Sequence, residues 1–144
     1  MADILRNDIL IVSFLAWTLA QLSKLLIILL RERRLDLSYL ARAGGMPSSH
    51  SALVTALATS VGVTAGPGSV LFALAVVFAG IVMYDAAGVR QAVSVQARIL
   101  NRMLDEIVFE HAFNEKRLRE LIGHTPIEVL MGALLGFVVA SLFT

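Results

Sequence analysis

The fold is decided first by a long apolar run at residues 9–30, ILIVSFLAWTLAQLSKLLIILL. A helix rises about 1.5 Å per residue, so a run of this length can cross the roughly 30 Å hydrocarbon core of a bilayer. Only one basic residue, Arg6, precedes the run, and no small-residue cleavage site follows it. We therefore expect a retained membrane helix and not a removed signal peptide.

The composition of the whole chain is that of an integral membrane protein. Its 144 residues are 58% hydrophobic and 16% charged, with a mean hydropathy of +0.81. That is too apolar for an ordinary soluble enzyme, a disordered segment or a nucleic-acid-binding module. The net charge of +1 is also too small to attract a polyanion such as a nucleic acid from a distance. The chain has no cysteine, which excludes disulfides and cysteine zinc sites. We expect no metal or other cofactor and no nucleic-acid partner.

Three further apolar runs follow, at about residues 48–65, 69–84 and 126–144. The pattern predicts an all-α fold, a polytopic bundle of about four transmembrane helices that forms a single domain over residues 1–144. The run at 48–65 is rich in Ala, Val, Thr and Ser, which favours a helix packed against other helices. Gly132 and Gly136 form a GxxxG pair in the last run, which permits close helix approach.

A charged stretch at residues 88–123 separates the third and fourth runs. Its apolar residues recur at spacings of three, four and seven, the pattern of an amphipathic helix. This helix either lies on the membrane surface or extends the third crossing out of the membrane. Asn114 suggests a bend before a second short helix at residues 115–122.

The basic residues indicate an orientation. Lys and Arg cluster in the connection after the first run and in the stretch at 88–123, whereas the 66–68 turn and the C-terminus carry none. The positive-inside rule therefore predicts an inner-membrane protein with both charged loops in the cytoplasm and both termini outside. Binding of substrate phosphate would also explain some of these arginines.

Several polar residues lie near those ends of the apolar runs that face the same side of the membrane, because successive crossings alternate in direction. They are Lys24, Arg31, Ser48, Ser49, His50, Asp85, Arg90, His124 and Glu128. Each has a purely structural alternative. Lys24 could extend its ammonium to the headgroups, and Ser48 and Ser49 could only cap a helix. Glu128 completes a capping box with Thr125, a sufficient structural role by itself. The alternatives leave unexplained why two histidines, a Ser-Ser helix start and several cations share one side.

A bound phosphate monoester requires this combination of groups. Cationic donors neutralise its oxygens, and a helix N-terminus directs backbone N–H groups at the anion. Hydrolysis without a metal also requires a nucleophile and a proton donor for the leaving alkoxide, and two histidines can divide those tasks.

The motifs resemble those of a known family. Three groups of residues resemble, in order, the three signature motifs of the type 2 phosphatidic acid phosphatase (PAP2) superfamily. They are Lys24 and Arg31 with six residues between them, Pro47-Ser48-Ser49-His50, and His124 and Glu128 with three residues between them. That superfamily includes lipid phosphatases and vanadium haloperoxidases. GGMPSSHS, YDAAGVR and GHTPIEVL look more closely like its small divergent branch, and the resemblance covers about residues 20–137.

The resemblance implies a role for each matching residue. His124 would be the nucleophile that forms a phosphohistidine, Glu128 would orient its imidazole, and His50 would be the general acid. The phosphate would be held by Lys24, Arg31, Ser48 and Ser49, with Arg90 and Arg119 as candidates for a further cation. Asp85 and Gln96 have no counterpart in the motifs, and their spacing of eleven residues puts them on one helix face if the helix is continuous.

Three positions depart from the family pattern: Glu32 replaces a proline, Glu128 an aspartate and Leu118 an arginine. The leading hypothesis is a membrane-embedded phosphatase acting on a phosphorylated lipid, and the small number of crossings suggests a homodimer. The main alternative is an inert relative that binds anionic headgroups or serves as an assembly partner. A small transporter or channel subunit is a third reading.

Overall fold

The computed structural model describes residues 6–33, 45–108 and 124–144. The described chain is all-α, as predicted, and contains no strand. It has five helices: α1 (Asp8–Glu32), α2 (Ser49–Ala65), α3 (Val70–Ala87), α4 (Val89–Val108) and α5 (Pro126–Phe143).

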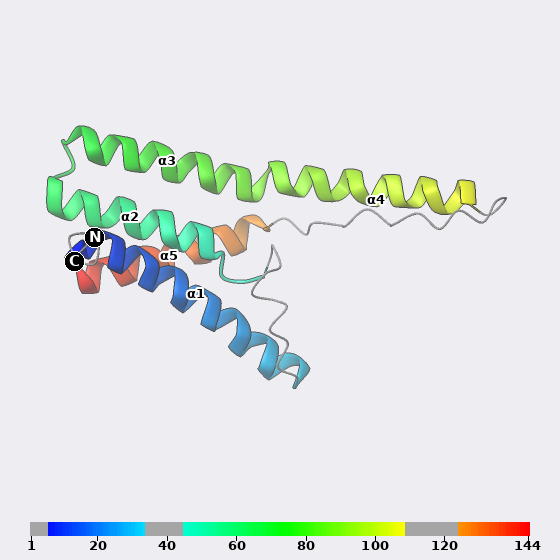
Figure 1. Cartoon of the computed structure of the whole chain (residues 1–144), viewed down its shortest axis with the longest axis horizontal. Coiled ribbons are helices and arrows are strands. Elements are labelled where there is room, and N and C mark those ends of the chain that lie inside the picture. Colours follow the sequence, from blue (N-terminus) through cyan, green and yellow to red (C-terminus); the bar gives the residue numbers. More distant parts are fainter. Residues whose placement is uncertain (1–5, 34–44, 109–123) are drawn as a thin grey trace.

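Helix α2 lies at the centre of the bundle and packs against α1, α3 and α5 (Figure 1). It runs antiparallel to α3, which it joins through the 66–68 turn. That turn, the start of α1 and the end of α5 lie at one end of the bundle (Figure 1). The end of α1, the start of α2, the end of α3 and the start of α5 lie at the other end, called the site end below.

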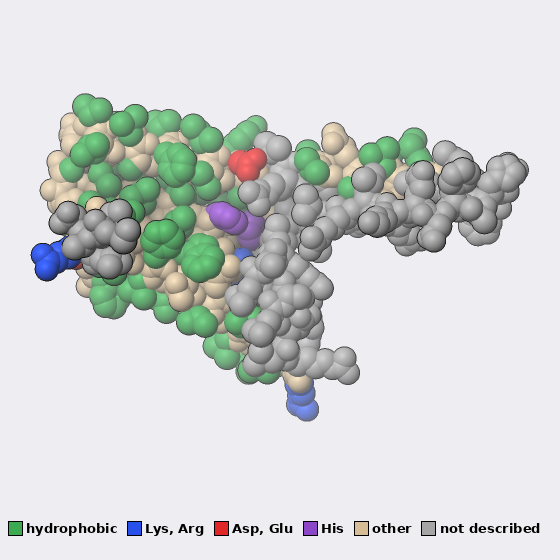
Figure 2. All heavy atoms as spheres, viewed as in Figure 1, with side chains coloured by type: hydrophobic (Ala, Val, Ile, Leu, Met, Phe, Trp, Pro, Cys, Tyr) green, Lys and Arg blue, Asp and Glu red, His purple; other side chains and the backbone are tan. Residues whose placement is uncertain are grey.

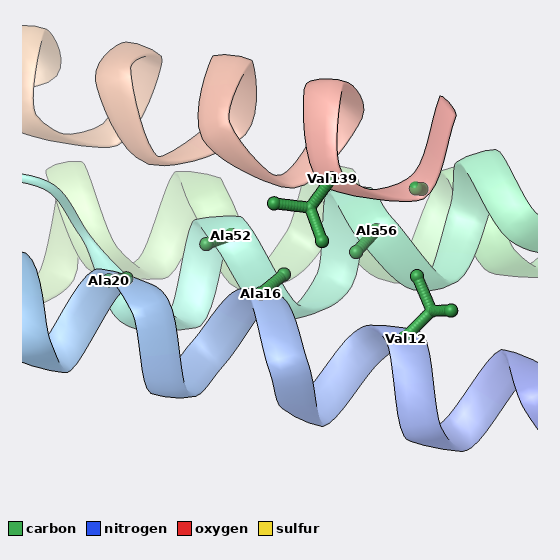
Figure 3. Packing of buried hydrophobic residues seen from close by; sticks show 7 residues of the cluster. Val12, Ala16, Ala20, Ala52, Ala56 and Val139 are labelled. Atoms are coloured by element: carbon green, nitrogen blue, oxygen red, sulfur yellow. The ribbon is translucent and has the colours of Figure 1, made fainter. Parts of the chain in front are cut away.

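Small side chains allow α1, α2 and α5 to approach closely. The cluster between them consists mostly of alanines, with Ala16, Ala20, Ala52 and Ala56 fully buried (Figure 3). Membrane helices associate through close van der Waals packing, because lipid tails are as apolar as the side chains. The alanine-rich composition that predicted a packed helix at 48–65 is explained by this central position.

The GxxxG pair of α5 lies at a close contact with α2. A Cβ at Gly132 would collide with the backbone carbonyl of Ser48, and one at Gly136 would collide with that of Ala52. Both glycines therefore face α2, and the missing side chains let the two backbones touch. Since Ser48 is the N-cap of α2, this contact sets the position of the start of α2 against α5.

Three helices are long and apolar enough to cross a membrane: α1 over Asp8–Leu30, α3 over Val70–Ala87 and α5 over Pro126–Phe143. Hydrophobic side chains are spread over the whole visible face of the bundle (Figure 2). The fourth predicted crossing, α2, is not among the three, because it has only 17 residues and is rich in Ser, Thr and Ala. The expectation of about four crossings is thus supported for three helices only.

The predicted amphipathic helix is present as α4, and it extends α3 beyond the bundle (Figure 1). Gly88 marks the junction, where its N–H donates to Tyr84 O (2.8 Å) and its carbonyl accepts from Ala92 N (3.0 Å). Helical hydrogen bonding therefore continues across the junction. The structure therefore agrees with the second of the two predicted placements, in which this helix extends the third apolar helix. The second short helix predicted at 115–122 lies outside the described residues.

Candidate functional site

The site end of the bundle gathers residues from α1, α2, α3 and α5. Histidine is visible there between the apolar bundle surface and the residues drawn in grey (Figure 2). The largest fully buried side chain of the described residues, His124, lies there, as do the buried side chains of Lys24, Ser48 and Ser49. Buried polar groups in an otherwise apolar bundle are concentrated at this end.

His124 is anchored by its backbone between two helices. Its side chain is 1% exposed, and its N–H donates to the carbonyl oxygen of Ala86 in the last turn of α3 (3.2 Å). His124 is thereby held where α3 ends and α5 begins.

Glu128 joins the cap of α5 to the imidazole of His124. The side-chain oxygen of Thr125 accepts from Glu128 N (3.3 Å), and Glu128 Oε2 accepts from Thr125 N (3.1 Å), which completes the capping box. The same Oε2 lies 3.1 Å from His124 Nδ1. The structural and the functional explanations of Glu128 are therefore compatible, because one carboxylate serves both contacts.

This contact favours a proton on one of the two ring nitrogens. A carboxylate can only accept, so the pairing favours the tautomer with hydrogen on Nδ1 and a lone pair on Nε2. It also stabilises an imidazolium if Nε2 becomes protonated or phosphorylated, since the carboxylate then opposes a positive ring. The arrangement is that of a histidine oriented by an acid.

The start of α2 is fixed by serines and by α5. Ser48 caps the helix by accepting from Ser51 N (3.3 Å), and the Ser51 hydroxyl donates to Ser48 Oγ (3.0 Å). Ser48 N donates to the backbone carbonyl of Glu128 (2.9 Å). The N-terminal turn of α2, with its partial positive charge, consequently lies against the first turn of α5.

Lys24 brings a full positive charge to the same place. Its side chain is only 5% exposed, and Nζ lies 3.5 Å from Ser49 Oγ. Gly45, with φ +85°, lies against the aliphatic part of the side chain, where a Cβ would be 3.8 Å from Lys24 Cδ. Lys24 does not reach out to the headgroups, which was the structural alternative for it.

The contacts that Lys24 makes with the described residues do not fully balance its charge. The Glu128 carboxylate attracts it, but Glu128 already accepts from His124 and Thr125. A buried ammonium beside a helix N-terminus is unfavourable unless anions compensate both positive charges. The site therefore suits a bound anion with several acceptor oxygens.

The structure unites only part of the predicted set. Lys24, Ser48, Ser49, His124 and Glu128 are connected through the contacts above. His50 is exposed in the first turn of α2, and Asp85 is partly buried in the last turn of α3, both at the site end. Gln96 is exposed on α4, beyond the bundle, so it does not join the site.

The arginine predictions remain largely open. Arg31 lies in the last turn of α1 and Arg90 in the first turn of α4, with their side chains outside the described set. Arg119 lies outside the described residues, as does Leu118. Within the described ranges, no three His, Asp or Glu side chains gather as a metal site would require.

Three contributors were not identified from the sequence. Ser51 lies within the quoted motif, and its spacing of three from Ser48 is the only signal for its role. Gly132 was recognised as part of a GxxxG pair, but not as the contact that receives the Ser48 carbonyl. Ala86 acts through its backbone carbonyl, for which its residue type carries no signal.

Comparisons with known proteins agree with these motifs. Residues 5–139 match the model of the divergent PAP2 family. The chain is 42% identical, over 93% of its length and 92% of the relative's, to a protein of Bacillus subtilis (strain 168) described as the uncharacterized membrane protein YuiD. No solved structure matches the chain.

Proposed function

Because the chain belongs to the divergent PAP2 family, we propose that it is a membrane-embedded phosphatase that removes phosphate from a phosphorylated lipid through a phosphohistidine intermediate. The single observation that carries the proposal is the buried His124, paired through Nδ1 with Glu128 Oε2 at 3.1 Å. A buried histidine oriented by a carboxylate is a nucleophile and base arrangement, and it needs no metal to work.

In the first step, the Nε2 lone pair of His124 attacks phosphorus. The P–N bond forms as the bond from phosphorus to the lipid oxygen breaks, and the lipid alkoxide takes a proton from His50 acting as general acid. In the second step, water attacks the phosphohistidine. The P–N bond breaks, inorganic phosphate leaves, and the proton lost by the water restores His50. One water is consumed in each cycle.

The charges at the site end match the needs of the transferred group. Lys24 and the N-terminal turn of α2 at Ser48 and Ser49 would hold the phosphate oxygens. Glu128 would keep the His124 ring in position and balance its positive charge in the intermediate. The arginines at positions 31, 90 and 119 are proposed as further phosphate-binding groups on the strength of the sequence alone.

The position of the site supports a lipid as substrate. It lies where two candidate membrane spans, α3 and α5, end and begin, a place that corresponds to the membrane surface. A phosphorylated headgroup can enter there while its hydrocarbon tail stays in the bilayer.

Purified protein in detergent or nanodiscs, assayed against a panel of lipid phosphates with and without a chelator, tests the proposal. Phosphate release should survive the chelator and be inhibited by vanadate, which takes the five-coordinate shape of phosphoryl transfer. His124→Ala should abolish turnover. Activity that a chelator removes and vanadate leaves unchanged would indicate a metal phosphatase instead.

The inert headgroup-binding alternative is favoured by the departures at Glu32 and Leu118, where the superfamily pattern has proline and arginine. It predicts that the wild-type protein binds anionic lipid headgroups and releases no phosphate from any member of the panel.

A further inference from the structure

The hydroxyl of Ser51 makes an unusual hydrogen bond for a serine inside a helix. Ser13 and Ser23 in α1 and Ser141 in α5 each donate to the backbone carbonyl four residues back, at distances between 2.6 and 2.8 Å. That is a common bond of helical serines. Ser51 is fully buried and instead donates to a side-chain oxygen, Ser48 Oγ, at 3.0 Å. The proposed chemistry gives Ser51 no part.

The helix cap alone does not require this bond. Ser48 caps α2 by accepting from Ser51 N at 3.3 Å, which satisfies one N–H of the first turn. That contact uses one lone pair of Ser48 Oγ, and the Ser51 hydroxyl uses the other. A serine oxygen has two lone pairs and one hydrogen, so Ser48 has only its hydrogen left to offer.

The hydrogen of the Ser48 hydroxyl points away from α2. Both bonds that Ser48 Oγ accepts come from Ser51, which lies on the helix side of this oxygen. Ser48 is 0% exposed, and no contact among the described residues takes its hydrogen. A buried donor is unfavourable unless an acceptor reaches it. The oxygens of a phosphate bound at the start of α2 are such acceptors.

Ser49 has a related arrangement. Its side chain is 2% exposed, and its Oγ lies 3.5 Å from Lys24 Nζ. An ammonium can only donate, so Ser49 Oγ is the acceptor in this contact and keeps its hydrogen for another partner. The two serines that begin the site therefore each accept from a side chain behind them, Ser51 or Lys24, and each can donate forward.

We propose that Ser51 is a positioning residue of the site, which fixes the Ser48 hydroxyl as a donor to the phosphate group of the substrate. The inference rests on the proposed function, which places that phosphate at the start of α2. Ser51 does not touch the phosphate and acts only through Ser48. Without the Ser51 hydroxyl, Ser48 Oγ regains a free lone pair, and its hydrogen is no longer held in one direction.

A double-mutant cycle tests whether Ser51 acts through Ser48. The quantity measured is the dissociation constant of orthovanadate, determined by calorimetry on purified protein in detergent. Ser48→Gly removes the donor itself, and glycine at a helix N-cap costs little stability compared with serine. The four proteins are the wild type, Ser51→Ala, Ser48→Gly and the double variant.

Ser51→Ala should weaken vanadate binding about fivefold, the effect of one ordinary hydrogen bond. Ser48→Gly should weaken it about tenfold or more, because a donor to a charged acceptor is lost. The double variant should match Ser48→Gly within about twofold, the error expected of such a cycle. Losses that simply multiply would show that Ser51 acts independently of Ser48 and would overturn the inference.

Two further variants separate the hydrogen bond from packing. Ser51→Cys keeps a side chain of nearly the same size but has only a weak S–H donor, so it should bind vanadate as weakly as Ser51→Ala. Wild-type affinity in Ser51→Cys would mean that only volume matters at this position. Ser60→Ala is the matched control, since Ser60 is also a fully buried serine of α2, with its hydroxyl 2.8 Å from that of Thr144. It should leave vanadate binding unchanged.

Failure of the inference and failure of the proposed function are distinct results, because vanadate binding requires no turnover. If the cycle is non-additive as described, the inference holds even when no lipid phosphate is hydrolysed. If lipid phosphates are hydrolysed but Ser51→Ala binds vanadate as tightly as the wild type, the inference is wrong and the proposed phosphatase activity stands. Wild-type protein that binds no vanadate would contradict the inference as well.

Discussion

His124 Nδ1 and Glu128 Oε2 lie 3.1 Å apart across one turn at the start of α5, and the same oxygen also accepts the N–H of Thr125 at 3.1 Å. The helix cap thus holds the carboxylate in the one position from which it orients the imidazole. Local helix capping and a proposed catalytic contact depend on a single side chain, which makes that side chain the most informative one to alter.

Glu128→Gln separates these two roles. Glutamine still completes a capping box but cannot oppose the charge of an imidazolium. We expect kcat to fall about 100-fold, less than the roughly 10⁴-fold loss on neutralising the acid of a serine protease triad, with nearly unchanged thermal stability. Steady-state kinetics and thermal unfolding in the same detergent measure both. A variant with wild-type turnover would leave Glu128 a purely structural residue.

Lys24→Met tests the buried cation. Removing a charge-assisted contact to the phosphate, worth about 1.5–3 kcal/mol, should weaken vanadate inhibition about 10- to 100-fold. The melting temperature should hold or rise, because a buried ammonium is replaced by an apolar side chain of similar length. Arg6→Met, at an exposed position just before α1, is the control and should change neither quantity. If Lys24→Met retained full vanadate sensitivity, the anion site would have to lie elsewhere.

Gly132→Ala tests the close contact between α5 and α2. The added Cβ meets the Ser48 carbonyl and forces the start of α2 away from α5. Overpacking of this kind should destabilise the protein by about 1–3 kcal/mol and also reduce activity, because Ser48 and Ser49 move. Gly80→Ala, in α3, is the matched control: no atom lies within 4 Å of its added Cβ. In thermal unfolding, the Gly80→Ala variant should be as stable as the wild type or slightly more stable. Equal losses of stability in the Gly132→Ala and Gly80→Ala variants would contradict the close contact.

Orientation in the membrane can be measured cleanly, because the chain has no cysteine. The positive-inside rule predicts that the 66–68 turn faces the outside and the end of α1 the cytoplasm. Pro67→Cys should react with an impermeant maleimide on intact cells, and Arg33→Cys only after permeabilisation; both positions are exposed. The reverse labelling would move the site to the outer surface and change where substrate is collected, without altering the proposed chemistry.

The sequence by itself determined the features that depend on short stretches of chain. The apolar runs predicted helices α1, α3 and α5, and the small residues of 48–65 predicted that α2 would be packed among other helices. Thr125 and Glu128 predicted a capping box, and Gly132 with Gly136 predicted a close approach. Periodicity, caps and small-residue spacing act over one or a few turns, so a single sequence carries them.

Only the tertiary structure decided how those elements meet. Lys24 and Ser49 are 25 residues apart, and the crossing of α1 and α2 alone determines that the ammonium is buried against the hydroxyl and does not extend to the headgroups. Likewise, no residue pattern marks the Ala86 carbonyl as the acceptor for His124. These contacts follow from helix packing between distant segments, where backbone groups and burial matter more than residue type. The same packing places α2 at the centre of the bundle, in contact with α1, α3 and α5.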